Sequence, residues 1–462
     1  MKKLLTLLFL ITVYLSNGQT WTGLGVGTSA GIITIDTFNN KLYVAGAFDS
    51  AGGKAMNAIA SWDGVNWAVV GSAISFKKNA FINALTVFNG NLYAAGSFDS
   101  VDGKPVNNIA EWTGSQWSWL GTGINGTVNA LTVYNGSLCA GGLFNSADGI
   151  KTNNIALWNG TNWSAINSGI KSTSPNNFGV EALIVYNGNL YVGGGIDTAG
   201  SIPVNNIAEW DGIKWDSLGA GIIGQGSLVG SQVKSFAIFN GNLYAGGAFE
   251  YAGNVKAYNV AYWNSNAWGC PGTATGNNST EINSLIVYGN RLYEGGTDIK
   301  WGNSYLEYWN DTTWNFPNGS GVWGHPTGSF SHSVVNAFGI LKNSLYIGGY
   351  FDTAGGEPAN NIVEWNDPTG INDLSRAISA NIFPNPSPDG FFTFQFNNPS
   401  EFVEDDCSIE VYNLLGEKVR STFNIQNSTF RIDISGQPAG IYLYRVTSEK
   451  GELVGSGKLV IE

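Results

Sequence analysis

The chain has 462 residues, of which 13% are aromatic and only 12% are charged, and it contains 63 glycines and 17 tryptophans. A disordered chain would be poor in aromatic residues and rich in charge, and a helical or coiled-coil protein would use more Ala, Glu, Lys and Leu, so the composition excludes both classes. The formal net charge of -12 opposes attraction to phosphate backbones and anionic lipid, and we expect no nucleic-acid partner.

The N-terminus has the features of an export signal. Lys2 and Lys3 precede an apolar run over residues 4–15, and small and polar residues follow at 16–19. As a helix this run would rise only about 18 Å, whereas the hydrocarbon core of a bilayer is about 30 Å thick. Residues 1–19 are therefore predicted to be a secretory signal peptide, and no transmembrane segment is expected in the mature chain.

Cysteine is scarce, with only Cys139, Cys270 and Cys407 in the chain. An odd number cannot be fully paired, and a domain of this size does not need disulfides. Cys139 stands where the equivalent strands carry Tyr, and we predict a buried structural thiol there.

Internal repetition dominates residues 20–370. The segment NALTVFNGNLY at residues 83–93 returns with few changes at 129–139, 181–191 and 234–244. The Leu near the end of this segment marks seven copies, spaced 46 to 53 residues apart: Leu42, Leu92, Leu138, Leu190, Leu243, Leu292 and Leu345. Repeats of this length are typical of propeller blades, each built from four strands.

Each copy is predicted to contain four antiparallel strands. An apolar run such as residues 82–88 is followed by Asn89-Gly90, which favours a tight hairpin turn, and by a second strand. The third strand ends at a Trp and the fourth begins with another five residues later, as in Trp112 and Trp117, so the two are expected to face each other in the core. In each copy, the second strand contains a Gly at the same position (Gly96 in the second copy), as expected where two backbones approach closely.

The seventh copy lacks a fourth strand after Trp365. The missing strand is found at the other end of the chain, where residues 21–27 (WTGLGVG) match fourth strands such as residues 117–123 (WSWLGTG). We therefore predict an all-β, seven-bladed β-propeller over residues 20–370, in which the N-terminal strand completes the last blade and closes the ring.

The pattern hydrophobic-Leu-Tyr-x-Gly-Gly, followed by the paired-Trp hairpin, resembles kelch-type propeller repeats. It is more similar still to repeats of the Rax2-like family, which read LYVGG-F-D-x-A-G-G, N-N-I-A-x-W-D-G, W and L-G-x-G. Residues 92–123 and 190–221 carry this form, and the resemblance covers about residues 21–370. It implies a propeller that acts at a cell surface, but it does not fix the ligand.

Composition changes after Gly370, where the repeat and the tryptophans end. Residues 371–381 are predicted to be a linker, and apolar segments at 391–396, 408–413, 441–447 and 458–461 predict a small antiparallel β-sandwich over residues 382–462. An accessory sandwich without a sorting role is one interpretation of this tail.

The elements FPNPSPDG, VYNLLGEKV, PAGIYLYRV and KLVIE of the tail together resemble the type A sorting domain of the type IX secretion system. The resemblance implies a Gram-negative source, type IX secretion machinery as a partner, and a protein that is secreted or displayed on the outer cell surface.

Inner strands begin with a polar residue in six copies. Because strands alternate in direction, these starts share a face with the long loops and with the links between blades, where propellers are expected to bind. We predict a polar ring around the channel, with six candidate ligand-binding residues: Asn83, Asn129, Glu181, Lys234, Asn283 and Asn336. The alternative is a set of solvated strand starts with an ion pair between Glu181 and Lys234.

The sixth copy departs most from the repeat. Its loop and the following link contain Trp301, Trp323 and His325, which are further ligand-binding candidates because an exposed Trp beside polar groups suits stacking on a sugar or an aromatic ring. A loop without function is the alternative. His325 and His332 lie seven residues apart without a nearby carboxylate, so no metal site is expected. Asp49, Asp99, Asp197 and Asp352 lack the dense spacing of a calcium loop and are predicted to cap turns.

No catalytic residues are predicted. A glycosidase needs two carboxylates near the channel, and the ring offers only Glu181. We expect a binding or adhesion module at the cell surface, with a glycan or a surface protein as ligand and no cofactor. A secreted enzyme acting on polysaccharide and a structural surface-layer protein are the alternatives.

Overall fold

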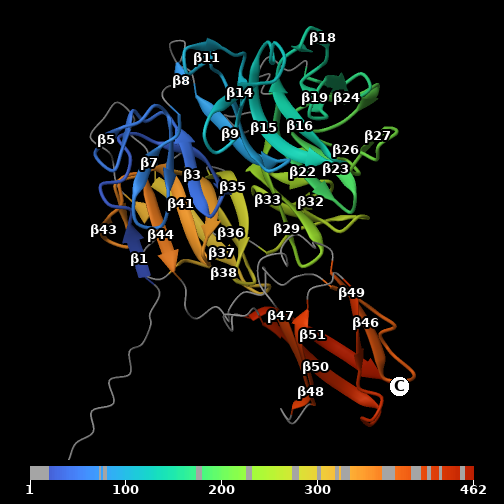
Figure 1. Ribbon diagram of the computed structural model, residues 1–462. Helices are drawn as coiled ribbons and strands as arrows, with labels where there is room; N and C mark the ends of the chain where they lie inside the picture. Colours follow the sequence, from blue (N-terminus) through green and yellow to red (C-terminus); the bar gives the residue numbers. More distant parts are fainter. Residues whose placement is uncertain are drawn as a thin grey trace, which may run out of the picture. The chain divides into compact units, whose positions relative to one another are not determined.

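The computed structural model describes residues 20–71, 74–75, 81–172, 179–224, 231–272, 280–298, 303–317, 322–323, 333–366, 380–396, 407–413, 418–425, 429–447 and 453–462. The chain divides into two compact units, Met1–Thr369 and Gly370–Glu462. Every regular element among the described residues is a β-strand (Figure 1). The predicted signal peptide, residues 1–19, lies outside the described part.

The first unit contains seven four-stranded antiparallel sheets among its described residues, numbered here 1 to 7 in chain order. From the inner strand outward they are sheet 1, β2 (Ile32–Phe38), β3 (Lys41–Gly46), β6 (Ile59–Trp62) and β7 (Trp67–Val69); sheet 2, β9 (Ile82–Phe88), β10 (Asn91–Gly96), β13 (Ile109–Trp112) and β14 (Trp117–Trp119); sheet 3, β15 (Thr127–Tyr134), β16 (Ser137–Leu143), β19 (Ile155–Trp158) and β20 (Trp163–Ala165); sheet 4, β22 (Gly179–Tyr186), β23 (Asn189–Gly195), β26 (Ile207–Trp210) and β27 (Trp215–Ser217); sheet 5, β29 (Gln232–Phe239), β30 (Asn242–Ala248), β33 (Val260–Trp263) and β34 (Trp268–Gly269); sheet 6, β35 (Thr280–Tyr288), β36 (Arg291–Asp298), β37 (Asn303–Trp309) and β38 (Trp314–Asn315); and sheet 7, β40 (Val334–Leu341), β41 (Ser344–Tyr350), β44 (Ile362–Asn366) and β1 (Thr20–Gly23).

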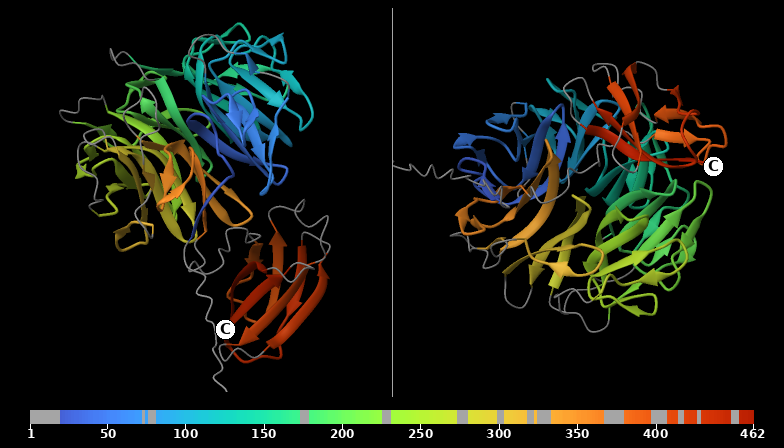
Figure 2. Two further views of the ribbon diagram at one scale, coloured as in Figure 1. Left: turned by 90° about the vertical axis from the view of Figure 1, so that its left-hand side faces the viewer. Right: turned by 90° about the horizontal axis from the view of Figure 1, so that it is seen from below.

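The inner strands of the seven sheets lie beside one another in chain order, and β40 of sheet 7 lies beside β2 of sheet 1. The sheets therefore form a closed ring, in which the first sheet (blue) and the last (orange) are neighbours (Figure 2). A ring of four-stranded antiparallel sheets is a β-propeller.

The closing strand is present as the sequence predicts. β1 pairs antiparallel with β44, which sets Trp21 opposite Trp365 with their ring centroids 4.3 Å apart. The contact continues beyond the strand, because the side-chain amide of Asn361 donates a hydrogen bond of 2.9 Å to the carbonyl oxygen of Thr28. Residues from the two ends of the unit thus share one sheet and its flanking loop.

The local predictions for turns and core agree with the structure. Asn89 and Gly90 have φ angles of 48° and 75°, as a two-residue hairpin turn of this type requires. The paired tryptophans of the first six sheets have ring centroids 5.1 to 5.5 Å apart. Cys139 is fully buried, and burial raises the pKa of its thiol.

Short two-residue strands on the loops were not predicted. The loop between the second and third strands folds into a tiny hairpin in six of the sheets, and in four of them the hairpin also pairs with the link that precedes the sheet. These strands are β4 (Ser50–Ala51) and β5 (Lys54–Ala55); β8 (Ile74–Ser75), β11 (Ser100–Val101) and β12 (Lys104–Pro105); β17 (Ser146–Ala147) and β18 (Ile150–Lys151); β21 (Ile170–Lys171), β24 (Thr198–Ala199) and β25 (Ile202–Pro203); β28 (Ile222–Ile223), β31 (Tyr251–Ala252) and β32 (Val255–Lys256); and β39 (Val322–Trp323), β42 (Thr353–Ala354) and β43 (Glu357–Pro358).

The second unit contains two antiparallel sheets among its described residues. One has three strands, β45 (Ala380–Phe383), β46 (Phe391–Phe396) and β49 (Thr429–Asp433), and the other has four, β48 (Lys418–Ile425), β47 (Cys407–Asn413), β50 (Gly440–Thr447) and β51 (Leu453–Ile461). Both sheets contribute to one apolar core, which includes Phe392, Phe394, Val411 and Tyr444. The sequence did not predict β45, β48 and β49.

Candidate functional site

A β-bulge occurs at the same position of the inner strand in all seven sheets. In sheet 3, Val128 lies opposite Gly142 and Ala130 lies opposite Gly141, so Asn129 has no partner in the register. The unpaired position is occupied, in chain order, by Ile33, Asn83, Asn129, Glu181, Lys234, Asn283 and Asn336. A bulge redirects a side chain and bends the strand, which explains how each ring residue is aimed away from its own sheet.

The glycine that recurs in the second strand of every copy lies at each bulge. Two backbones approach each other closely there, as the sequence predicted, and this explains why the residue is Gly. A Cβ atom placed on Gly96 would lie 2.0 Å from the carbonyl oxygen of Phe81, and one on Gly296 would lie 1.8 Å from that of Glu281. Any side chain would therefore collide with backbone that cannot move without losing the bulge.

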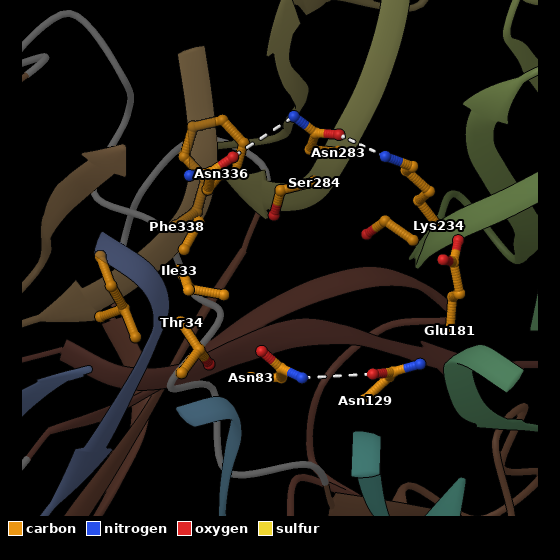
Figure 3. A pocket seen from close by; sticks show the side chains of 13 residues that line it. Ile33, Thr34, Asn83, Asn129, Glu181, Lys234, Asn283, Ser284, Asn336 and Phe338 are labelled. Carbon is orange, nitrogen blue, oxygen red and sulfur yellow. Dashed lines mark hydrogen bonds between the residues drawn. The ribbon is translucent and has the colours of Figure 1, made fainter. Parts of the chain in front are cut away.

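The six predicted ring residues line one central cavity of about 510 Å³ (Figure 3). Ile33 fills the equivalent position of sheet 1, and Ile35 and Phe338 also line the cavity. One part of its wall is thus formed by amide, carboxyl and ammonium groups, and another part is apolar. The structure brings together the six predicted residues, which are up to 253 positions apart in the sequence, from Asn83 to Asn336.

The ring amides connect neighbouring sheets in one direction. Asn129 donates a hydrogen bond of 3.1 Å from Nδ2 to the carbonyl oxygen of Val180, the residue before the ring position of the next sheet. The same contact is made by Asn83 to Val128 (3.2 Å), by Asn283 to Val335 (3.3 Å) and by Asn336 to Ile32 (2.9 Å). Asn83 also donates to Oδ1 of Asn129 at 3.2 Å, and Asn283 donates to Oδ1 of Asn336 at 3.4 Å (Figure 3).

Glu181 interrupts this series, because an ionised carboxylate can only accept hydrogen bonds. Its Oε2 atom is buried and has no hydrogen-bond partner among the residues that the structure describes. Burial raises the pKa of Glu181 from 4.5 to about 7; the charge of Glu281 also raises it, whereas that of Lys234 lowers it. The ring therefore contains a carboxyl group that changes protonation near neutral pH.

Lys234 does not form the ion pair that one interpretation of the sequence predicted. Its Nζ lies 2.7 Å from Oε1 of Glu281 and donates to Oδ1 of Asn283 at 3.1 Å, both in sheet 6. The prediction of a Glu181–Lys234 pair was wrong, because the side chain of Lys234 extends toward the next sheet, as the side chains of the ring asparagines do, and away from Glu181. Glu281 is also a second carboxylate beside the ring, which the sequence analysis did not identify.

The candidates of the sixth copy are only partly described. Trp301 and His325 lie outside the described residues, as does His332. Trp323 lies in β39, where its backbone pairs with Thr353 of sheet 7's small hairpin. The link that contains Trp323 is therefore part of a three-stranded ribbon at this point.

Two buried glutamates in sheet 6 were missed. Glu294 and Glu307 lie directly opposite each other on β36 and β37, and both are 0% exposed. The equivalent pair is apolar in the other six sheets, for example Ala94 and Ala110. A comparison of the strands as well as the loops of the copies would have shown that sheet 6 has Glu where the other sheets have apolar residues.

The recurrent aspartates lie in turns, where their backbone closes the loop. The carbonyl oxygen of Asp99 accepts a hydrogen bond from the amide of Val106 at 2.9 Å, and Asp49, Asp197 and Asp352 accept the equivalent bond. Within the described ranges, no three His, Cys, Asp or Glu side chains gather as metal ligands would. The described residues also contain no helix that could cross a membrane.

Comparison with known families identifies the tail. Residues 381–462 match the family described as the secretion system C-terminal sorting domain. The tail is therefore a sorting domain that engages the type IX secretion system, and the protein is exported to the cell surface or released from it. No curated protein matches the chain.

The similar solved structures are distant. The extracellular domain of a protein from B. thetaiotaomicron, described as a one component system, is 12% identical over 94% of this chain, with a TM-score of 0.42, and the chain spans 57% of its length. The β-propeller domain of the Trilobed protease from Pyrococcus furiosus is 10% identical over 73% of this chain and 95% of its own, with a TM-score of 0.39.

Proposed function

We propose that the protein is a binding module at the cell surface, which recognises a glycan in the central cavity of a seven-bladed, kelch-like or Rax2-like propeller. In this proposal the seven sheets are the blades, residues 1–19 are the signal peptide, and the two C-terminal sheets form a sandwich that serves for export. Secretion places the cavity where extracellular polysaccharide is available.

The observation that supports a ligand most strongly is the buried Oε2 atom of Glu181, which has no hydrogen-bond partner in the described part of the chain. A buried polar atom without a hydrogen bond costs about 1–3 kcal/mol, more for a charged group. A ligand hydroxyl or ammonium group that donates to this oxygen would remove that cost. Neighbouring Asn129 and Lys234 offer donors to the oxygen atoms of the same ligand.

The cavity also suits the two-sided chemistry of a sugar. Hydroxyl groups at the edge of a pyranose ring can bond with the amides and with Glu181, and its C–H faces can pack against Ile33 and Phe338. A volume of about 510 Å³ falls within the range of ligand pockets, about 300–1,000 Å³.

Hydrolysis of a glycan is a second candidate, supported by Glu181 and Glu281. A carboxyl group with a pKa of about 7 could act as a general acid, and Glu281 is close enough to influence it. We favour binding without catalysis, because Glu281 is already held by Lys234 and by Gln232, which donates to Oε1 at 3.0 Å.

A glycan array probed with the full mature chain, followed by calorimetry on any hit, tests the proposal. Glu181→Ala should weaken binding at least tenfold, because a hydrogen bond to a charged group contributes about 1.5–3 kcal/mol. Glu357→Ala, which removes an exposed carboxylate, is the matched control. Equal affinity of all three proteins would exclude the cavity as the site, and absence of binding to any glycan would contradict the proposal. Release of reducing ends would establish the hydrolase.

A further inference from the structure

Trp119 is exposed at a position where the other sheets present a variety of smaller residues. It lies two residues after the fourth-strand tryptophan Trp117 and is 53% exposed, whereas Trp117 is buried. The equivalent residues, in chain order, are Gly23, Val69, Ala165, Ser217, Cys270 and Phe316. Trp119 is the largest of the seven side chains at this position, and the fold itself does not require an indole there, since Ala and Ser occupy the same place in other sheets.

Trp119 borders a pocket of about 290 Å³ at the edge of sheet 2. The pocket lies between the end of β14, which is the outer strand of the sheet, and the segment that leads into β13. Pro105, Asn107 and Ile109 line one side, and Trp119 and Thr122 line the other. Among its lining residues, the buried Val106, Ile109 and Leu120 are apolar, whereas the polar Asn107 and Thr122 are exposed, a combination found in sites that bind small polar molecules.

The polar groups at this pocket are held by the fold. Asn107 donates from Nδ2 to the carbonyl oxygen of Thr122, and the hydroxyl of Thr122 donates to Oδ1 of Asp148 at 2.8 Å. Lys104 extends over the indole, with Nζ 4.9 Å from the ring centroid. Because Lys104 is exposed, its ammonium group can move from the ring face to a ligand oxygen at little cost.

We propose that the Trp119 pocket is a sugar-binding subsite in which a pyranose ring stacks on the indole. The C–H face of the sugar would cover the exposed indole. Lys104 would bond with a hydroxyl group or, in a uronic acid, with the carboxylate. This subsite is separate from the central cavity, but it rests on the proposed function in that its ligand is an extracellular glycan.

The register of sheet 2 places both sites at the same end of the sheet. Leu85, Ala94, Ala110 and Trp119 lie in one row across the four strands, and Asn83 lies two residues before Leu85. Four strands at about 4.8 Å spacing span about 15 Å. One oligosaccharide chain that runs outward along sheet 2 could therefore reach both sites.

The test compares the full mature chain with Trp119→Ala and with Phe316→Ala. Phe316 occupies the equivalent position of sheet 6 and is 58% exposed, which makes it a matched control for loss of a surface aromatic ring. Neutral and uronic-acid oligosaccharides serve as probes in calorimetry. We expect at least a tenfold loss of affinity for Trp119→Ala, no change for Phe316→Ala, and a larger loss for uronic acids than for neutral sugars in Lys104→Ala.

Acrylamide quenching of tryptophan fluorescence gives a second, independent measurement. Bound oligosaccharide should cover Trp119 and lower the quenching of the wild type, and it should leave the quenching of Trp119→Ala unchanged. Unchanged affinity of Trp119→Ala, or an equal loss in Phe316→Ala, would overturn the subsite. If Glu181→Ala alone loses binding, the proposed function stands and the subsite is wrong, whereas failure of the wild type to bind any oligosaccharide overturns both.

Discussion

The side-chain amide of Asn336 donates a hydrogen bond of 2.9 Å to the backbone carbonyl oxygen of Ile32, across 304 positions of the sequence. Asn129 makes the same contact to Val180, between two sheets that follow each other directly in the chain. The interface between sheets 7 and 1, which closes the ring, therefore contains the same contact as the interface between sheets 3 and 4. Closure depends on the contacts of the repeat as well as on the N-terminal strand.

This equivalence predicts that Asn336→Ala and Asn129→Ala lower the free energy of unfolding by the same amount. Each removes the bond donated to the carbonyl oxygen of the next sheet and the bond that Oδ1 accepts from the preceding ring asparagine, so we expect the free energy of unfolding to fall by about 1–3 kcal/mol in both. Tryptophan fluorescence during chemical denaturation measures the first unit alone, because all 17 tryptophans lie between residues 21 and 365. Asn66→Ala, at an exposed hairpin position, should change stability by less than about 0.5 kcal/mol. A loss in Asn129→Ala without one in Asn336→Ala would show that the closing bond is absent in solution.

The N-terminal strand should stabilise the ring through Trp21. Its indole packs against Trp365 at 4.3 Å, and Trp21→Ala would leave that buried side chain with a cavity beside it. For a half-buried Trp we expect a loss of about 3 kcal/mol, which for a unit of this size lowers Tm by about 4 °C. Thr22→Ala changes an exposed residue of the same strand and is the control. Equal melting of Trp21→Ala and wild type would contradict closure by β1, as would an unchanged Tm after deletion of residues 20–30.

The sequence predicted the parts of the fold that depend on local chemistry. Asn89-Gly90 marks a turn because both residues tolerate positive φ, and the pair Trp112 and Trp117 marks a hairpin by its spacing. Because Asn83 and its equivalents occupy the same position of the repeat, they were predicted to lie at the same place on each inner strand. That point is the cavity wall, so the candidate site could be located from the sequence.

The parts that were missed depend on contacts between sheets. Nothing in the sequence indicates that Lys234 turns to Glu281 in place of Glu181, since each carboxylate lies on the inner strand of a sheet next to that of Lys234. The bulge at each ring position is also a property of two paired strands, although Gly96 marks its place. Trp119 was overlooked because Trp117, two residues earlier, was already identified as the tryptophan that pairs with Trp112 in the core.

The recurrent glycine gives a sharp prediction at Gly96. In Gly96→Ala the new Cβ would lie 2.0 Å from the carbonyl oxygen of Phe81, and the bulge that presents Asn83 would have to open. We expect a loss of about 3 kcal/mol or more in the free energy of unfolding. Gly136→Ala is the control in the same unit, measured in the same way by tryptophan fluorescence: no atom lies within 4 Å of its added Cβ, so only the cost of its positive φ, about 1 kcal/mol, is expected. Wild-type stability of Gly96→Ala would show that close approach does not explain why this position is glycine in every copy.

Glu181 should make the stability of the first unit depend on pH near neutrality. Its pKa is about 7 in the folded protein and 4.5 in the unfolded chain, because burial penalises the charged form. The folded state therefore holds the proton more tightly, and this stabilisation is complete below pH 4.5 and is lost as pH rises to about 7. Wild type should lose about 2–3 kcal/mol relative to Glu181→Gln between pH 5 and pH 8, measured by denaturation followed by tryptophan fluorescence. Asp36, whose pKa burial raises to about 6, is unchanged in both proteins and cancels in this difference. A difference that stays constant with pH would show that Glu181 is ionised throughout, with a partner for its charge that the ring does not provide.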